Sequence, residues 1–247
     1  MHVSITEITG DFMKMIDTVK AALVGVSLVA STGLFAAAPV LTTEVAVGKL
    51  ELPWDMSFLK DGTMFFTEKC KGLSVRLPSG AINKLHSIGG IAGYASTSAD
   101  LFCDGQAGMM GVEVDPDFAK NRLIYVYSSS KLDGKLNNRL MRMKVDDAFT
   151  NVSGRTDIVP DVNYKPAASK HPFGGPGAHN GGRVRFSPLD GFIYVTTGDN
   201  HLGVGPQSPT IIAGKVLRID RDGKAAPDNK PPAGFDHRIY AYGMRNP

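Results

Sequence analysis

The sequence predicts an all-β fold of the β-propeller type, and three observations support this prediction. Beyond residue 45 the apolar residues follow the two-residue alternation of strands, with almost no helical periodicity. The chain of 247 residues contains 28 glycines and 15 prolines, which suits many tight turns between short strands. A unit made of a hairpin followed by further strands recurs three times, and a recurring unit of this kind is typical of propeller blades.

Each predicted unit opens with two alternating segments joined by a turn rich in Asp, Gly and Pro. Alternation indicates half-buried antiparallel strands, and Asp-Gly is a strong hairpin signal. The three predicted hairpins pair 54–59 with 63–67, 111–115 with 123–127, and 183–186 with 192–196.

Further strands are predicted after each hairpin, at 73–77, 81–85, 139–145 and 215–220. Phe65, Tyr125 and Tyr194 hold equivalent positions in the three units, at spacings of 60 and then 69 residues. Compact propeller blades repeat every ~40–45 residues, so we expect inserted loops. The segment 238–242 is expected to begin a fourth unit. Because a propeller closes a ring of about 4–8 blades, we expect the chain to be the first part of a longer protein.

Residues 1–45 are expected to lie outside this domain, which spans 46–247. An apolar, uncharged run at 21–38 follows Lys14 and Lys20 and ends in small residues. This layout is typical of a secretory signal peptide and predicts a periplasmic or secreted protein. The alternative is an uncleaved anchor, which would be the only expected contact with a membrane.

Charge and cysteine content narrow the function classes. A formal net charge of +3, without a basic run, argues against nucleic acid as a partner. The two cysteines, Cys70 and Cys103, lack the spacing of a zinc site, and no metal ligands are assigned. In an exported chain they could form a disulfide or remain two buried thiols, and the sequence leaves both readings open.

The segment 177–186 places a histidine, His179, in a glycine-rich bend directly before a predicted strand. Glycines let the backbone approach a ligand closely, and a loop histidine at a strand edge is a candidate general base. The competing interpretation is a solvated loop histidine. Asp199, just after the next strand, could orient His179 or cap a turn.

Four segments in order carry a family resemblance: 105–118, 178–186, 213–220 and 239–247. Together they resemble the soluble quinoprotein glucose/sorbosone dehydrogenases, six-bladed propellers that bind pyrroloquinoline quinone (PQQ) and calcium. The resemblance implies oxidation of an aldose or related hydroxy-aldehyde, with electrons passed on to an acceptor. The chain would cover about the first three blades and the start of a fourth.

The resemblance also implies roles for individual residues. His179 matches the catalytic histidine, which takes a proton from the substrate hydroxyl while hydride passes to the quinone. Arg245 matches an arginine that stabilises charge on the quinone oxygen, and is thus both catalytic and cofactor-binding. Asn246 matches a cofactor-contacting asparagine. Gln106 matches a glutamine lining the sugar pocket, although it could instead hydrogen-bond a turn.

The chain departs from the family pattern in several places. Ala178 stands where glucose-oxidising members have an acidic residue, which puts glucose itself in doubt, and Met244 replaces a histidine. The segment 220–223 superficially suggests calcium but is interpreted as a hairpin turn.

The family's remaining PQQ contacts and its calcium ligands are not found in this sequence, so we expect no sugar oxidation by this chain alone. The alternatives to a dehydrogenase are a non-catalytic extracellular propeller that binds carbohydrate or protein, and a calcium-dependent lactonase.

Overall fold

The computed structural model describes residues 41–165 and 174–247, which divide between a unit at 1–48 and a unit at 49–247. The predicted signal segment at 21–38 lies outside the described residues, so that prediction stays untested. Residues 41–48 contain no helix or strand. Within the described ranges, no helix is long and apolar enough to cross a membrane.

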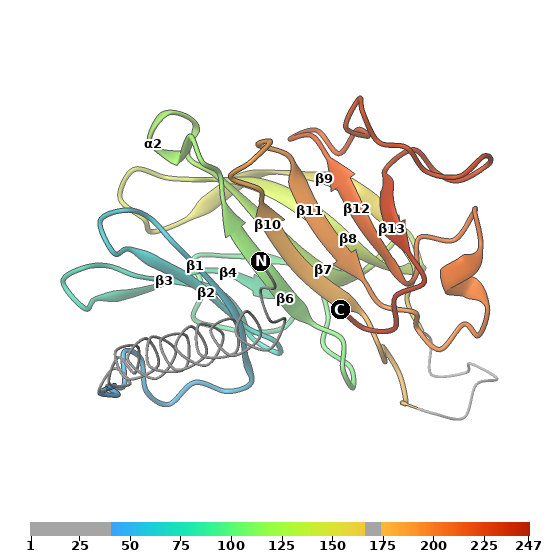
Figure 1. The fold of residues 1–247 in the computed structure, drawn as a ribbon. Coiled ribbons are helices and arrows are strands. Elements are labelled where there is room, and N and C mark those ends of the chain that lie inside the picture. The colour runs from blue at the N-terminus through green and yellow to red at the C-terminus, as the bar shows by residue number, and fades with distance from the viewer. Residues whose placement is uncertain (1–40, 166–173) are drawn as a thin grey trace, which may run out of the picture. The chain divides into compact units, whose positions relative to one another are not determined.

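The unit at 49–247 consists of three sheets, each built from strands that follow one another in the chain (Figure 1). The first sheet contains β1 (Pro53–Phe58), β2 (Met64–Glu68), β3 (Gly72–Arg76), β4 (Ile82–Ile88) and β5 (Ser96–Ser98). The second contains β6 (Met109–Val114), β7 (Leu123–Leu132), β8 (Lys135–Val145) and β9 (Val152–Val162). The third contains β10 (Gly181–Phe186), β11 (Ile193–Thr197), β12 (Lys215–Ile219) and β13 (Ile239–Tyr242).

All neighbouring strands are antiparallel except β5, which pairs parallel with β4. A short helix, α2 (Phe118–Asn121), lies between β6 and β7, and a 3₁₀ turn, η1 (Gly205–Gln207), lies between β11 and β12. The predicted hairpin equivalence is confirmed, because Phe65, Tyr125 and Tyr194 each occupy the second rung from the turn.

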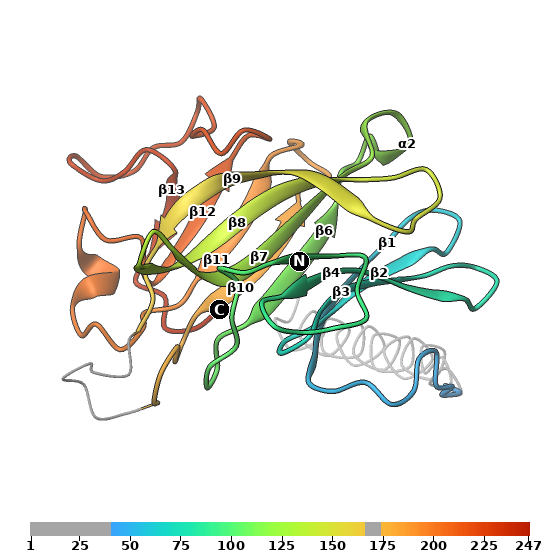
Figure 2. The same ribbon diagram turned by 180° about the vertical axis from the view of Figure 1, so that it is seen from behind.

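The sheets pack face to face through two apolar clusters, and β6 of the second sheet contacts both β1 and β10 (Figure 2). The first cluster joins Phe65 and Leu73 to Val126 of the next sheet. The second joins Tyr127 to Val195 and Leu217 of the third sheet. Inward-facing alternate residues on successive sheets thus build a continuous core, as the propeller prediction requires.

One predicted boundary was wrong. The segment 238–242 does not begin a fourth sheet; β13 pairs antiparallel with β12, with Lys215 opposite Tyr242, and completes the third sheet. Alternation identifies a strand but not its partner, and here the partner is separated by the long loop after β12. The strand β9, which the sequence analysis missed, pairs antiparallel with β8 and is the fourth strand of the second sheet.

A buried carboxylate links the first strands of all three sheets. Asp55 of β1 accepts hydrogen bonds from the guanidinium groups of Arg183 and Arg185 of β10. Oδ2 of Asp55, which also accepts from Arg185, accepts the backbone N–H of Val112 in β6 at 3.1 Å. Because Asp55 is only 6% exposed, these bonds replace the water it loses on folding and fix the three strands relative to one another.

Candidate functional site

The N-terminal ends of β1, β6 and β10 border a cavity of about 270 Å³. Each of these strands contributes one lining residue: Trp54, Met110 and Gly181, respectively. The other lining residues come from the adjoining turns and loops and are Lys69, Gln106, Asn180 and Asn246. An indole, an ammonium and three amides around one cavity suit a polar, planar or hydroxylated ligand.

His179 directly precedes Asn180, which lines this cavity, but is not itself among the lining residues; it lies two residues before β10 and is only 7% exposed. Its Nδ1 is 2.7 Å from Oδ1 of Asp199. With the carboxylate as acceptor, Nδ1 carries the proton and Nε2 is left as the basic nitrogen. His179 is therefore not a solvated loop residue, and Asp199 orients its ring.

The backbone around His179 depends on a glycine crossing it. A Cβ at Gly198 would lie 1.9 Å from the carbonyl oxygen of His179, so any side chain there would force the two segments apart. The same carbonyl accepts hydrogen bonds from the backbone and side-chain amides of Asn200, at 3.3 and 3.0 Å. His179, Asn200 and His201 all have φ near +50°, a left-handed conformation that is uncommon for residues with a side chain. Such conformations concentrate at functional sites.

A second histidine, which the sequence analysis did not single out, stacks on the first. The rings of His179 and His201 have centroids 3.9 Å apart and planes inclined by 27°. The backbone N–H of His201 donates to Oδ1 of Asp199 at 2.9 Å, so this carboxylate holds the loop as well as the ring. Both interpretations of Asp199 are thus correct.

The donor atoms of His179, Asp199 and His201 lie within 4.8 Å of one another, a grouping that could in principle hold a metal ion. Imidazole lone pairs lie in the ring plane, and stacked rings do not direct them to one point. The arrangement is better suited to holding a proton than a metal.

Two of the remaining sequence-predicted residues line the cavity, and the third, Arg245, does not. Gln106 lines the cavity, and its Oε1 also accepts the backbone N–H of His179 at 3.1 Å, so it both faces the cavity and bonds a turn. Asn246 lines the cavity, and its Oδ1 accepts the N–H of Gly181 at 2.9 Å. Arg245 is exposed and is not among the lining residues; its backbone carbonyl accepts the N–H of Asp199 at 2.7 Å.

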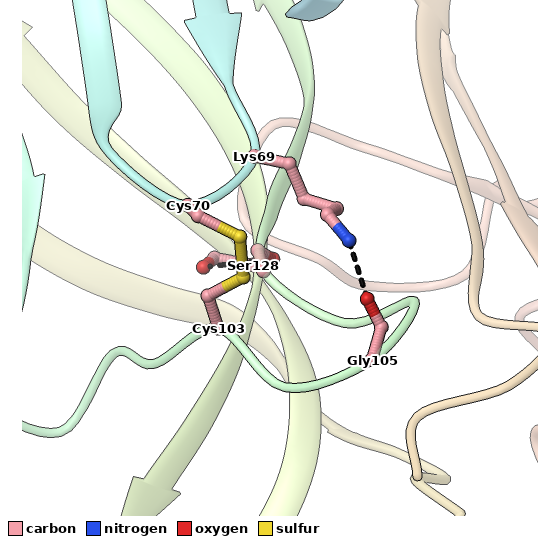
Figure 3. The surroundings of a disulfide bond; sticks show 6 residues. Lys69, Cys70, Cys103, Gly105 and Ser128 are labelled. Atoms are coloured by element: carbon pink, nitrogen blue, oxygen red, sulfur yellow. Dashed lines mark hydrogen bonds between the residues drawn. A yellow bond between two sulfur atoms is a disulfide. The ribbon is translucent and has the colours of Figure 1, made fainter. Parts of the chain in front are cut away.

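Cys70 and Cys103 form a disulfide, which settles the alternative that the sequence left open (Figure 3). The bond joins the turn after β2 to the loop before β6. Beside it, the ammonium of Lys69 donates to the carbonyl of Gly105 (Figure 3). The crosslink therefore holds together two segments that supply Lys69 and Gln106 to the cavity.

Two further sequence interpretations can be compared with the structure. Asp220 accepts backbone N–H groups from Asp222 and Lys224, and the segment forms the predicted turn. Ala178 is fully buried and offers no carboxylate beside His179. That carboxylate comes from Asp199 on another loop instead.

The model of the glucose/sorbosone dehydrogenase family matches residues 50–247. The aldose sugar dehydrogenase YliI of Escherichia coli K12 is 29% identical over 221 residues, which cover 88% of this chain and 54% of that protein. The quinoprotein glucose dehydrogenase B of Acinetobacter calcoaceticus is 28% identical over 227 residues, covering 83% and 44%.

Solved structures agree with these matches. The apo-form of the soluble aldose sugar dehydrogenase of E. coli has a TM-score of 0.62 at 25% identity and covers 80% of this chain and 52% of that one. The PQQ-bound aldose sugar dehydrogenase of Streptomyces coelicolor has a TM-score of 0.65 at 24% identity, covering 82% and 54%. The three sheets thus match about half of six-bladed propeller structures of this family, and the chain spans about half the length of the relatives it matches.

Proposed function

Because this chain belongs to the glucose/sorbosone dehydrogenase family, we propose that it contributes the general-base half of a PQQ-dependent dehydrogenase for an aldose or related hydroxy-aldehyde. The observation that carries the proposal is the hydrogen bond from His179 Nδ1 to Asp199, which leaves Nε2 as the basic nitrogen of a residue directly beside Asn180 of the polar cavity.

His179 takes the proton from the substrate hydroxyl at Nε2. Asp199 holds the ring in the required tautomer and stabilises the imidazolium that forms, and His201 supports one face of the ring. Gln106 accepts the backbone N–H of His179 and so helps to fix the position of the main chain that carries the base.

The residues around the cavity fit PQQ, a planar polar group with carboxylates and carbonyl oxygens. The amide of Asn246 offers donors and Lys69 offers a positive charge, whereas the amide nitrogen of Asn180 already donates to the carbonyl of Gly177. The chemistry that bound PQQ would supply is a two-electron acceptor for the hydride of the substrate carbon. Arg245, next to the lining residue Asn246, would offer a cation to a quinone oxygen.

We propose further that turnover requires propeller residues beyond this half, since the chain spans about half of its relatives and the family's other PQQ contacts were not found. Calcium binding, transfer of electrons to a separate acceptor, and a periplasmic or secreted location belong to the same proposal.

A chimaera tests the function: this chain joined in frame to the remaining half of the E. coli propeller, assayed for PQQ-dependent reduction of a dye by aldoses. We expect oxidation that falls about 100- to 10,000-fold in His179→Ala, the range for loss of a general base. His237→Ala, at an exposed histidine that does not line the cavity, is the matched control and should retain activity.

Equal rates in wild type and His179→Ala would contradict the proposal. A folded chimaera that binds sugar without oxidising it would favour the non-catalytic propeller.

A further inference from the structure

Lys69 is the one charged residue among those that line the cavity in the described part of the chain. No acidic side chain lines this cavity, and among the ion pairs of the described residues none involves Lys69. The neighbouring lysine differs: Lys71 pairs with Glu51 at 2.9 Å and with Glu68 at 3.5 Å. The Lys69 charge is therefore not neutralised by the protein itself.

The position of Lys69 is fixed from both sides. Its backbone carbonyl accepts the N–H of Met109 at 2.9 Å, where β6 begins. A Cβ at Gly108 would lie 2.3 Å from that carbonyl, so the close approach of the two segments depends on a glycine. The next residue, Cys70, is covalently bound to Cys103. These contacts fix the main chain of Lys69, so the side chain extends from a fixed Cα position, and ligand binding has to order only the side chain.

The ammonium donates one hydrogen bond, to the carbonyl of Gly105. An ammonium has three donors, so two are available to a molecule in the cavity. The adjacent residue, Gln106, adds an amide to the same wall. A fixed cation with free donors beside amides is the chemistry that recognises a carboxylate.

We propose that Lys69 is the carboxylate-binding group of this cavity. The carboxylate can belong to the substrate, as in a sugar acid, or to the cofactor, since PQQ carries three carboxylates. The inference rests on the proposed function only for the choice of these ligands. It adds a ligand-binding residue in the turn between β2 and β3, on the same cavity that Asn180 lines.

Trp54, the single tryptophan of the chain, lines the same cavity and reports on sugar binding through its fluorescence. Galacturonate and galactose form a matched pair, because they differ only in a carboxylate replacing a hydroxymethyl group. PQQ binding is measured separately by equilibrium dialysis. The variants are Lys69→Met, Lys69→Arg and the control Lys71→Met, all in the 247-residue chain.

If the substrate supplies the carboxylate, wild type binds galacturonate at least about tenfold more tightly than galactose, and Lys69→Met removes the difference. If the cofactor supplies it, Lys69→Met weakens PQQ binding by a similar factor and leaves the two sugars alike. In either case Lys69→Arg retains most of the affinity, and Lys71→Met retains all of it. The carboxylate affinity of wild type should also fall with rising salt, a measurement that needs no variant.

Two results would overturn the inference: wild type that binds neither galacturonate nor PQQ, or carboxylate binding that Lys69→Met and added salt leave unchanged. These outcomes are distinct from failure of the proposed function. Lys69-dependent binding together with oxidation indifferent to His179 would refute the dehydrogenase mechanism and leave the carboxylate site standing.

Discussion

Removal of the Cys70–Cys103 disulfide should destabilise the propeller unit substantially. The bond spans a sequence separation of 33 residues. Loop-closure entropy for a loop of that size corresponds to about 4 kcal/mol at 25 °C. For a unit of this length each kcal/mol lowers the midpoint by about 2–4 °C, so we expect Cys70→Ser/Cys103→Ser to melt about 10 °C below wild type.

The assay is urea unfolding of the oxidised wild type, the wild type reduced with dithiothreitol, and the double serine variant. The reduced wild type and the variant should agree with each other, which separates loss of the crosslink from the effect of the substitutions. Their urea dependence should also be steeper, because an uncrosslinked unfolded chain exposes more surface. A loss below about 1 kcal/mol in both would refute the entropic reasoning.

Three further predictions concern stability. Burial lowers the pKa of His86 to about 4, so between pH 6.5 and 4 the unfolded chain binds a proton that the folded chain does not. The free energy of unfolding therefore falls on acidification, by up to about 3 kcal/mol. Urea unfolding across this range should show a loss that His86→Gln reduces, and an equal loss in the variant would contradict the assignment to His86. Asp55→Ala should cost about 2–3 kcal/mol in urea unfolding, because it removes the bonds to Arg183 and the other groups that join three strands, and a neutral result would mean that solvent replaces them. Gly198→Ala should cost at least about 2 kcal/mol and speed hydrogen exchange of the backbone N–H of His179, because the new Cβ meets a backbone oxygen; unchanged exchange would show that the loops are not coupled.

The sequence was sufficient for the local features of the fold. Alternation and Asp-Gly turns act between neighbouring residues, so the hairpins are where they were predicted. The strand β9 was missed because Gly154 and Pro160 interrupt its alternation. The segment 238–242 was recognised as a strand but assigned to the wrong sheet, since pairing depends on contacts across a long loop.

The same limit applies to the site. His179 was found because glycines mark its bend, and family resemblance pointed to Gln106 and Asn246. His201 and Lys69 carry no local signal. The role of His201 depends on the loop after β11, which places its ring on that of His179. The role of Lys69 depends on the disulfide, which joins the turn after β2 to the loop before β6. The cysteine spacing alone could not decide between a bond and two thiols.

The central claim is that His179 accepts the substrate proton at Nε2, and chemical rescue tests it most directly. In the chimaera with the E. coli half, sugar-dependent dye reduction by His179→Ala is measured with increasing free imidazole. We predict that imidazole restores part of the lost rate in a saturable manner, because it replaces the missing base in the space that the side chain leaves. The contradicting result is a loss of activity in His179→Ala that neither imidazole nor small amines or carboxylates restore. It would indicate a structural role for His179.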